Sequence, residues 1–188
     1  MERQKKRLPV FGSLRGLCFA GILSAMSLIL GKFLQIPNPF QEIIRISFEN
    51  FPVIASGIIL GPVAGALVGI VADLLGCVLY GYTVNPIITL GAAAVGLISG
   101  FISNYVVKKP LLFKVIASTA AAHIVGSVLI KSAGLAAWYL SKYDIGYLEL
   151  LAWRLLNYTI VATAECIILY LLLNNRALYN QIKGIIKK

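Results

Sequence analysis

The chain has 188 residues, of which 59% are hydrophobic and 13% are charged, and its mean hydropathy is +0.87. An ordinary soluble domain carries about 25% charged residues, so this composition predicts a polytopic membrane protein instead. Apolar stretches close to the roughly 20 residues of a membrane helix recur six times, and they lack the two-residue alternation of a membrane β-barrel. We therefore expect an all-α bundle of six transmembrane helices, forming one domain over residues 1–188.

The net charge of +10 comes mainly from lysine and arginine residues that are concentrated in three parts of the chain. These basic clusters are Arg3, Lys5, Lys6, Arg7 and Arg15; Lys108, Lys109 and Lys114; and Arg176, Lys183, Lys187 and Lys188. The spacing matches the excess of lysine and arginine found on cytoplasmic loops. It therefore indicates membrane topology rather than nucleic-acid binding, and it predicts that both termini of this multi-pass membrane protein are cytoplasmic.

Residues 1–13 form a basic cytoplasmic tail, and residues 14–34 form the first helix. This apolar run is long and no small-residue cleavage site follows it, so we interpret it as a retained helix rather than a signal peptide. Small residues stand four apart in two overlapping pairs, which gives a flat strip that another helix can approach closely. The strip consists of Ala20, Gly21, Ser24 and Ala25. It serves either packing within this bundle or contact with a partner protein.

The next part of the chain predicts an outer connection and two helices. Residues 35–47 are polar and contain two prolines, which excludes a helix and favours an ordered loop. A short helix follows over residues 48–60, and a tight inner turn at Gly61-Pro62 leads into a third helix over residues 62–80.

Three further helices complete the predicted bundle. The fourth covers residues 86–107, and the fifth covers residues 111–139 and is long enough that we expect it to tilt or break near Gly134. The sixth covers residues 148–174. The basic tail over residues 175–188 has apolar residues at helical spacing and predicts an interfacial helix.

Charged side chains inside a membrane are costly and are usually paired or functional. With this topology, several of them converge with aromatic and amide side chains on the outer half of the bundle. The candidate binding residues are Arg45, Asp73, Tyr80, Asn85, Lys131, Trp138, Arg154 and Tyr158. Such a set suits a planar ring stacked on aromatic side chains, with ligand carboxylates held by lysine or arginine.

Two simpler interpretations of these residues stay open. The aromatic side chains also fit an interfacial belt at the helix ends. Asp73 is equally suited to an internal salt bridge with Lys131 or Arg154. For the deeper His123 and Glu165 we expect structural polar contacts.

Motifs of catalysis and of cofactor binding are missing from the sequence. There is no Ser-His-Asp set, no HExxH and no phosphate-binding GxxxxGK[ST] loop. The three cysteines are isolated from one another and the chain has one histidine, so we expect no metal site, no disulfide and no cofactor. We predict that the chain is not an enzyme, and that uphill transport would need an ion gradient or another subunit.

One stretch carries a family resemblance. The segment RISFENFPVIASGIILGPVAGALVGIVADLLG, from Arg45 to Gly76, resembles the second and third helices of S components, the substrate-binding subunits of energy-coupling factor (ECF) vitamin transporters. It is most similar to the folate-type subfamily, whose members carry a similar Arg-Ile-Ser-Phe, a Gly-Pro turn and Ala-Asp-Leu-Leu-Gly. The six helices and the chain length fit the family as well.

The resemblance implies a six-helix fold with a vitamin pocket between the outer loops and the outer halves of the helices. It implies that the strip on the first helix docks on a transmembrane T-component. Two partner ATPases would supply the energy, and reorientation of the subunit in the membrane would carry the ligand inward.

For folate, Lys131, Arg154 and Arg45 would hold the glutamate carboxylates, and Asp73 or Asn85 would read the pterin edge. The alternatives are the same fold with another vitamin-like ligand (thiamine, riboflavin, pantothenate or queuosine) and a membrane scaffold that binds no ligand.

Overall fold

The structure is a computed structural model that describes residues 13–37, 45–107, 110–136 and 146–187. Helices make up most of this part of the chain. They are α1 (Leu14–Phe33), α2 (Asn50–Leu60), α3 (Pro62–Tyr80), α4 (Pro86–Phe101), α5 (Leu111–Ala122), α7 (Tyr147–Asn174) and α8 (Arg176–Lys187). Two π-helical segments continue α4 and α5, namely η1 (Ile102–Val106) and η2 (His123–Ile130). Two short strands, β1 (Gln35–Pro37) and β2 (Arg45–Ser47), pair between α1 and α2.

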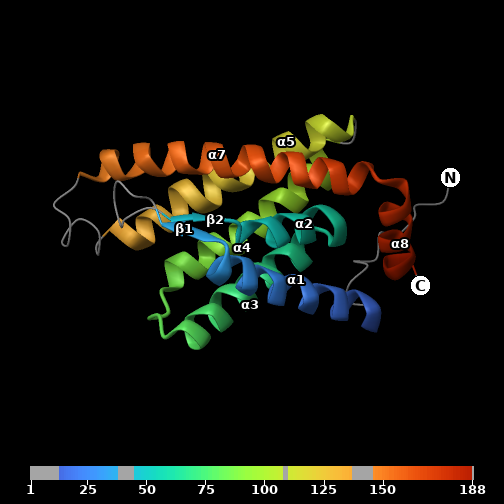
Figure 1. Cartoon of the computed structure of the whole chain (residues 1–188), viewed down its shortest axis with the longest axis horizontal. Coiled ribbons are helices and arrows are strands. Elements are labelled where there is room, and N and C mark those ends of the chain that lie inside the picture. Colours follow the sequence, from blue (N-terminus) through green and yellow to red (C-terminus); the bar gives the residue numbers. More distant parts are fainter. Residues whose placement is uncertain (1–12, 38–44, 108–109, 137–145, 188) are drawn as a thin grey trace.

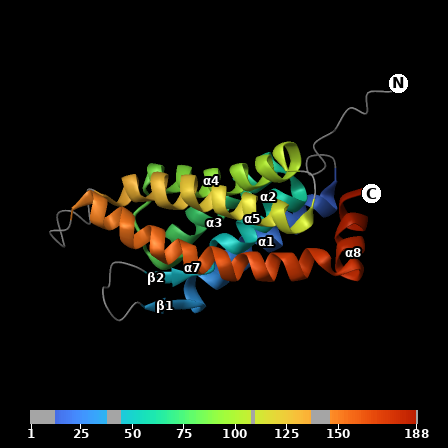
Figure 2. The ribbon, with the colours of Figure 1, turned by 90° about the horizontal axis from the view of Figure 1, so that it is seen from above.

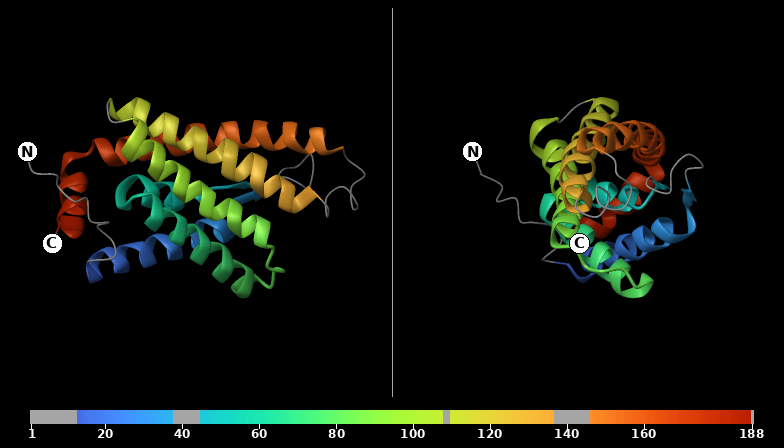
Figure 3. Two further views of the ribbon diagram at one scale, coloured as in Figure 1. Left: turned by 180° about the vertical axis from the view of Figure 1, so that it is seen from behind. Right: turned by 90° about the vertical axis from the view of Figure 1, so that its left-hand side faces the viewer.

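The helices lie side by side in an elongated bundle (Figure 1). In the described residues, five helical spans are long and apolar enough to cross a membrane, and the shorter apolar α2 is the sixth helix of the bundle. The start of α1 and the whole of α8 lie at the same end, and the α3–α4 connection lies at the other end (Figures 1 and 3). This arrangement confirms the predicted six-helix membrane fold and its up-and-down topology.

The turn between α2 and α3 forms where the sequence predicts it. Gly61 has a φ of 101°, a backbone conformation that side chains with a Cβ rarely adopt. Pro62 occupies the first turn of α3, where its missing N–H is not needed. The Gly-Pro pair therefore ends one helix and starts the next without an intervening loop.

Helices α3 and α4 approach each other more closely than side chains would allow. A Cβ added at Gly96 of α4 would overlap the backbone of Gly65 on α3, and one added at Gly69 of α3 would overlap the backbone of Ala92 on α4. Small residues permit this approach, and backbone packing of this kind stabilises helix pairs in membranes. Figure 2 shows α3 and α4 running along each other.

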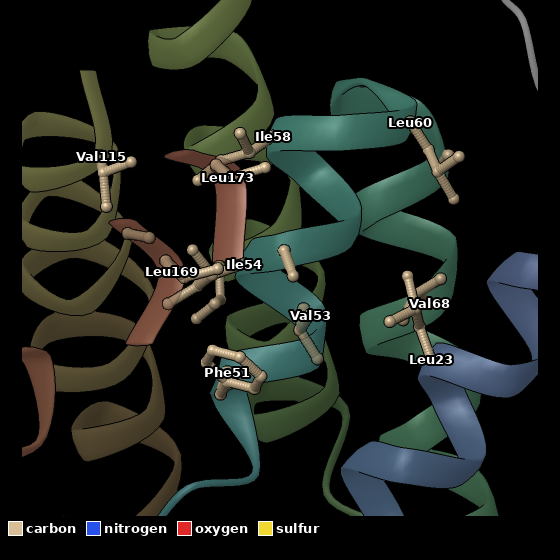
Figure 4. Close-up of a cluster of buried hydrophobic side chains, with 14 residues drawn as sticks. Leu23, Phe51, Val53, Ile54, Ile58, Leu60, Val68, Val115, Leu169 and Leu173 are labelled. Atoms are coloured by element: carbon tan, nitrogen blue, oxygen red, sulfur yellow. The ribbon is translucent and has the colours of Figure 1, made fainter. Parts of the chain in front are cut away.

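The core is centred on α2, in which ten of the eleven residues are buried. Figure 4 shows Ile54 and Ile58 of α2 directed toward Leu169 and Leu173 of α7. Since α2 is apolar on all sides and covered by the other helices, it belongs to the interior of the bundle rather than to its lipid-facing surface.

Two predicted details differ from the structure. The ends of the predicted irregular loop pair as antiparallel strands, with Ile36 opposite Ile46. Pro37 is tolerated because it stands at the end of a strand that has one neighbour and so needs few backbone donors. The fifth span was expected to tilt or break near Gly134. Residues 131–136 are helical, so the helix does not break there, and the irregularity within the described part of this span is the π-helical η2.

Candidate functional site

A cavity of about 110 Å³ lies in the half of the bundle that the predicted topology places outside. Side chains and backbone from α1, α2, α3 and α4 line it, together with the segment that follows η2. Its walls are Ser27, Leu28, Gly31, Glu49, Asn50, Val53, Gly69, Ala72, Asp73, Gly76, Cys77, Tyr80, Tyr82, Ala92 and Lys131. Ligand pockets commonly measure roughly 300–1,000 Å³. This cavity is therefore smaller than a typical ligand pocket and has room for only part of a larger ligand.

Asp73 reaches the cavity from α3. The hydroxyl of Thr89 on α4 donates a hydrogen bond of 2.6 Å to Asp73 Oδ2. No cation of the described residues lies within ion-pair distance of this carboxylate, so the anticipated salt bridge with Lys131 or Arg154 is not formed. A carboxylate held by one hydroxyl keeps lone pairs free to accept hydrogen bonds from a ligand.

Lys131 reaches the cavity from the opposite wall and is 6% exposed. Its Nζ donates to Glu49 Oε1 at 2.9 Å and to Asn50 Oδ1 at 3.3 Å. The pairing joins residues that are 82 positions apart in the sequence. Because Glu49 neutralises the ammonium, a ligand anion would have to compete with Glu49 for Lys131.

Tyr80 forms part of the aromatic wall. Its hydroxyl donates to the carbonyl of Leu28 at 2.8 Å, which fixes the ring between α3 and α1. The ring of Tyr82 meets it edge to face, with centroids 6.2 Å apart. The ammonium of Lys32 lies 5.0 Å from the Tyr80 ring centroid, within range of a cation–π contact.

Other candidate residues have contacts outside the cavity. Asn85 caps α4 by accepting from the Ile87 N–H at 3.0 Å, and its amide donates to the Gly134 carbonyl at 2.8 Å. Arg154 is buried and donates from Nη2 to the Ser127 carbonyl at 2.8 Å. Tyr158 lines a separate apolar groove between α5, η2 and α7.

The structure leaves two candidates largely untested. Arg45 belongs to β2, opposite Pro37, and its side chain is not described. Trp138 lies outside the described residues.

The sequence analysis did not identify Glu49 and Asn50 as wall residues of the site. The signal was present at Glu49 and Asn50, because polar residues at the start of an apolar helix place their side chains at the membrane boundary or in a protein interior. Their contact with Lys131 could not be predicted from the sequence, because no local pattern links these residues to Lys131.

The described residues contain no group of three or more histidine, cysteine, aspartate or glutamate side chains that could hold a metal ion. The wall of the cavity instead presents the Asp73 carboxylate, which can accept further hydrogen bonds, the Lys131 ammonium, which Glu49 neutralises, and the rings of Tyr80 and Tyr82. This set can bind a planar heterocycle whose edge donates hydrogen bonds.

The small strip on α1 is divided between two faces. Ser24 is 4% exposed and its hydroxyl donates to the Ala20 carbonyl at 3.1 Å, so this pair faces the bundle. Gly21 and Ala25 are exposed, and a Cβ added at Gly21 would meet no atom within 4 Å. The pair that is free for close approach by another helix is therefore Gly21 and Ala25.

The ion pair between Glu49 and Lys131 should give a measurable coupling free energy in a double-mutant cycle. We expect Lys131→Met to destabilise the protein, because it leaves Glu49 without its cation, and we expect the added change Glu49→Gln to restore part of the loss. The coupling should be about 1 kcal/mol or more, the range of contacting charged pairs. Unfolding of the purified single and double variants in mixed micelles measures it. Strictly additive effects would contradict the pairing.

The fold and the cavity define a membrane-embedded helical bundle with a candidate binding cavity. The family model of the S component of ECF-type riboflavin transporters matches residues 12–178, and the chain belongs to this family. It is thus a vitamin-binding subunit of a transporter in the cell membrane, and it is not an enzyme.

Two solved structures share this fold. A crystal structure of FolT bound with folic acid has a TM-score of 0.65 and 23% sequence identity, over 84% of this chain and 92% of that chain. The S component of a bacterial ECF transporter has a TM-score of 0.63 and 24% identity, over 92% of this chain and 97% of that chain. Comparison with curated proteins gives no match.

Proposed function

We propose that this S component captures folate from the outer side of the membrane. The observation that carries the proposal is the Asp73 carboxylate in the cavity, which a threonine hydroxyl holds and which forms no ion pair with a cation of the described residues. The edge of a pterin carries a ring N–H beside an amino group, two donors that match the two oxygens of one carboxylate. Tyr80 and Tyr82 supply aromatic surface for the ring.

Riboflavin is the second candidate, since the matching family model carries its name. Its ring edge has a single N–H between two carbonyl oxygens. A carboxylate facing that edge would accept one hydrogen bond and repel both carbonyl oxygens, so Asp73 favours the pterin over the flavin. The preference of Asp73 for the pterin depends on the ring edge alone and not on the glutamate tail of folate.

The tail would extend from the mouth of the cavity toward the outer connections. Lys32 lies beside Tyr80, and Arg45 belongs to the hairpin that precedes α2. Either could bind the tail carboxylates. Lys131 is less suited to them than the sequence suggested, because Glu49 already neutralises it, and Arg154 donates to a backbone carbonyl instead.

Calorimetric titration of the purified protein in nanodiscs tests the proposal. Folic acid should bind one to one, and pteroic acid, which lacks the glutamate, should bind more weakly. Riboflavin, thiamine, pantothenate and queuosine should give no heat. Binding of riboflavin with silence toward folic acid would assign the site to the flavin, and silence toward every vitamin would favour a scaffold.

We further propose that the exposed pair Gly21 and Ala25 docks on the T-component, and that two partner ATPases drive release of the vitamin to the inside. The change Gly21→Leu should abolish co-purification with the T-component and ATPases while leaving folate affinity within about twofold, since a Cβ added at Gly21 would meet no atom of the described residues within 4 Å. The matched change Ile22→Leu, at an exposed neighbour on the same helix, is the control. Normal co-purification of the Gly21→Leu protein would exclude this surface.

A further inference from the structure

A chain of hydrogen bonds leads from the cavity to a buried acid deep in the bundle. Lys131 Nζ donates to Asn50 Oδ1 at 3.3 Å, and Asn50 Nδ2 donates to Ser127 Oγ at 3.4 Å. Ser127 Oγ lies 3.2 Å from His123 Nδ1, and His123 Nε2 lies 2.6 Å from Glu165 Oε2. All five side chains are buried, and Glu165 is fully so.

The chemistry of the donors sets the direction of this chain. An ammonium only donates, so Asn50 must turn its carbonyl oxygen toward Lys131 and its NH₂ group toward Ser127. Ser127 Oγ therefore accepts from Asn50. Toward His123 it has two choices: it donates to an unprotonated Nδ1, or it accepts from a protonated one.

The proton on His123 is in turn linked to Glu165. If Glu165 is ionised, His123 Nε2 must carry a proton and donate to it. If Glu165 is protonated, it donates to Nε2, and the histidine proton then moves to Nδ1 and points at Ser127. A change in the hydrogen bond between Asn50 and Ser127 therefore changes which atom of the His123–Glu165 pair carries the proton. Likewise, a change in the position of that proton changes the hydrogen bond between Asn50 and Ser127.

The π-helical η2 contributes two members of this chain, His123 at its start and Ser127 one turn later. Arg154 on α7 donates to the Ser127 carbonyl, and Tyr158 on α7 stacks on the His123 ring with centroids 5.0 Å apart. The titratable and charged groups around the chain come from every element packed on it. They are Glu49 beside α2, Asp73 on α3, Lys131 after η2, and Arg154, Tyr158, Glu165 and Cys166 on α7.

We propose that His123 and Glu165 are positioning residues of the vitamin site, which act through Ser127 and Asn50 on Lys131. Occupancy of the cavity and placement of the proton in the His123–Glu165 pair are linked. The ligand part of this inference rests on the proposed function, whereas the coupling along the chain does not.

His123 is the one histidine of the sequence, so ¹⁵N-histidine labelling gives the signals of a single imidazole, provided the affinity tag contains no histidine. Protonated and unprotonated ring nitrogens have well-separated ¹⁵N shifts. In the ligand-free protein, Lys131→Met removes the donor to Asn50 and should shift the His123 signals. The control is Lys114→Met on α5, a lysine that takes no part in the chain. Wild-type signals in the Lys131→Met protein would overturn the coupling, whichever vitamin binds.

Ligand titration then tests the link to occupancy. Saturating folic acid should shift the His123 signals of the wild-type protein, and Ser127→Ala should abolish that shift and weaken folate binding roughly tenfold, the size expected for a buried hydrogen bond. The control is Ser118→Ala, another buried serine of the same span, whose hydroxyl has no partner in the described residues. Equal behaviour of the two serine variants, or bound folate without a shift, would overturn the role in positioning.

The dependence of affinity on pH separates this role from a purely structural one. The change Glu165→Gln removes the shared proton while keeping the size of the side chain. It should alter the dependence of folate affinity on pH, because residue 165 can then no longer exchange a proton with His123. A profile parallel to that of the wild type would show that Glu165 only fills space. If the wild type binds no folate, the proposed ligand fails, and the ligand-free measurement alone decides the coupling.

Discussion

Replacing Asp73 with asparagine should weaken folate binding by about 100-fold, the loss expected for a charge-assisted hydrogen-bond pair with a ligand. The amide keeps the size of the side chain, and its oxygen can still accept from Thr89. However, its NH₂ group would face the donors of the pterin edge. Calorimetric titration with folic acid measures the change in affinity.

The control for this prediction is the matched acid-to-amide change Glu149→Gln at the exposed outer end of α7. It should leave folate affinity within about twofold, because an exposed charge at that distance is largely screened. Wild-type affinity of the Asp73→Asn protein would remove Asp73 from the site. It would also remove the main reason for preferring a pterin to a flavin.

Replacing Gly96 with alanine should destabilise the bundle strongly. A single Cβ at this position would overlap the backbone of Gly65, and backbone cannot move aside as the end of a side chain can. We expect a loss of about 3 kcal/mol or more, at the upper end of overpacking in a close-packed interior. Thermal unfolding of the purified protein and its yield from membranes measure the loss.

The matched change Gly21→Ala tests whether the position or the residue type matters. Gly21 also lies within a helix, but a Cβ there would meet no atom within 4 Å. Alanine should therefore be neutral or stabilise the helix by up to about 1 kcal/mol. Equal effects of the two substitutions would contradict the close approach of α3 and α4.

Much of the fold was predictable from the sequence, because a lipid environment permits few backbone structures. The lengths of the apolar stretches predicted the helices. Gly61 and Pro62 predicted the turn, since each of these two residues has one well-known effect on backbone geometry. The paired strands before α2 were not predicted. Three residues on each side carry too weak a signal, and proline usually argues against a strand.

The candidate site was predicted in part. Asp73, Tyr80 and Lys131 do line one cavity, because the topology places the ends of their helices together. The partners were not predictable from spacing. Lys131 pairs with Glu49 rather than Asp73, and Arg154 turns toward Ser127, because these choices depend on helix rotation and on the π-helical η2. Helix rotation also decides which small pair of α1 faces outward.

The shortness of α2 affects which residues can alter the ligand specificity of such a subunit. An 11-residue helix is about 16 Å long, whereas the hydrocarbon core is about 30 Å thick. Glu49, directly before α2, borders the cavity at the start of this short helix, so a change there reshapes the cavity from one side. Gly69 and Ala92, where α3 and α4 pack backbone against backbone, line the same cavity. The close packing of these two helices therefore also fixes part of the shape that a ligand must match.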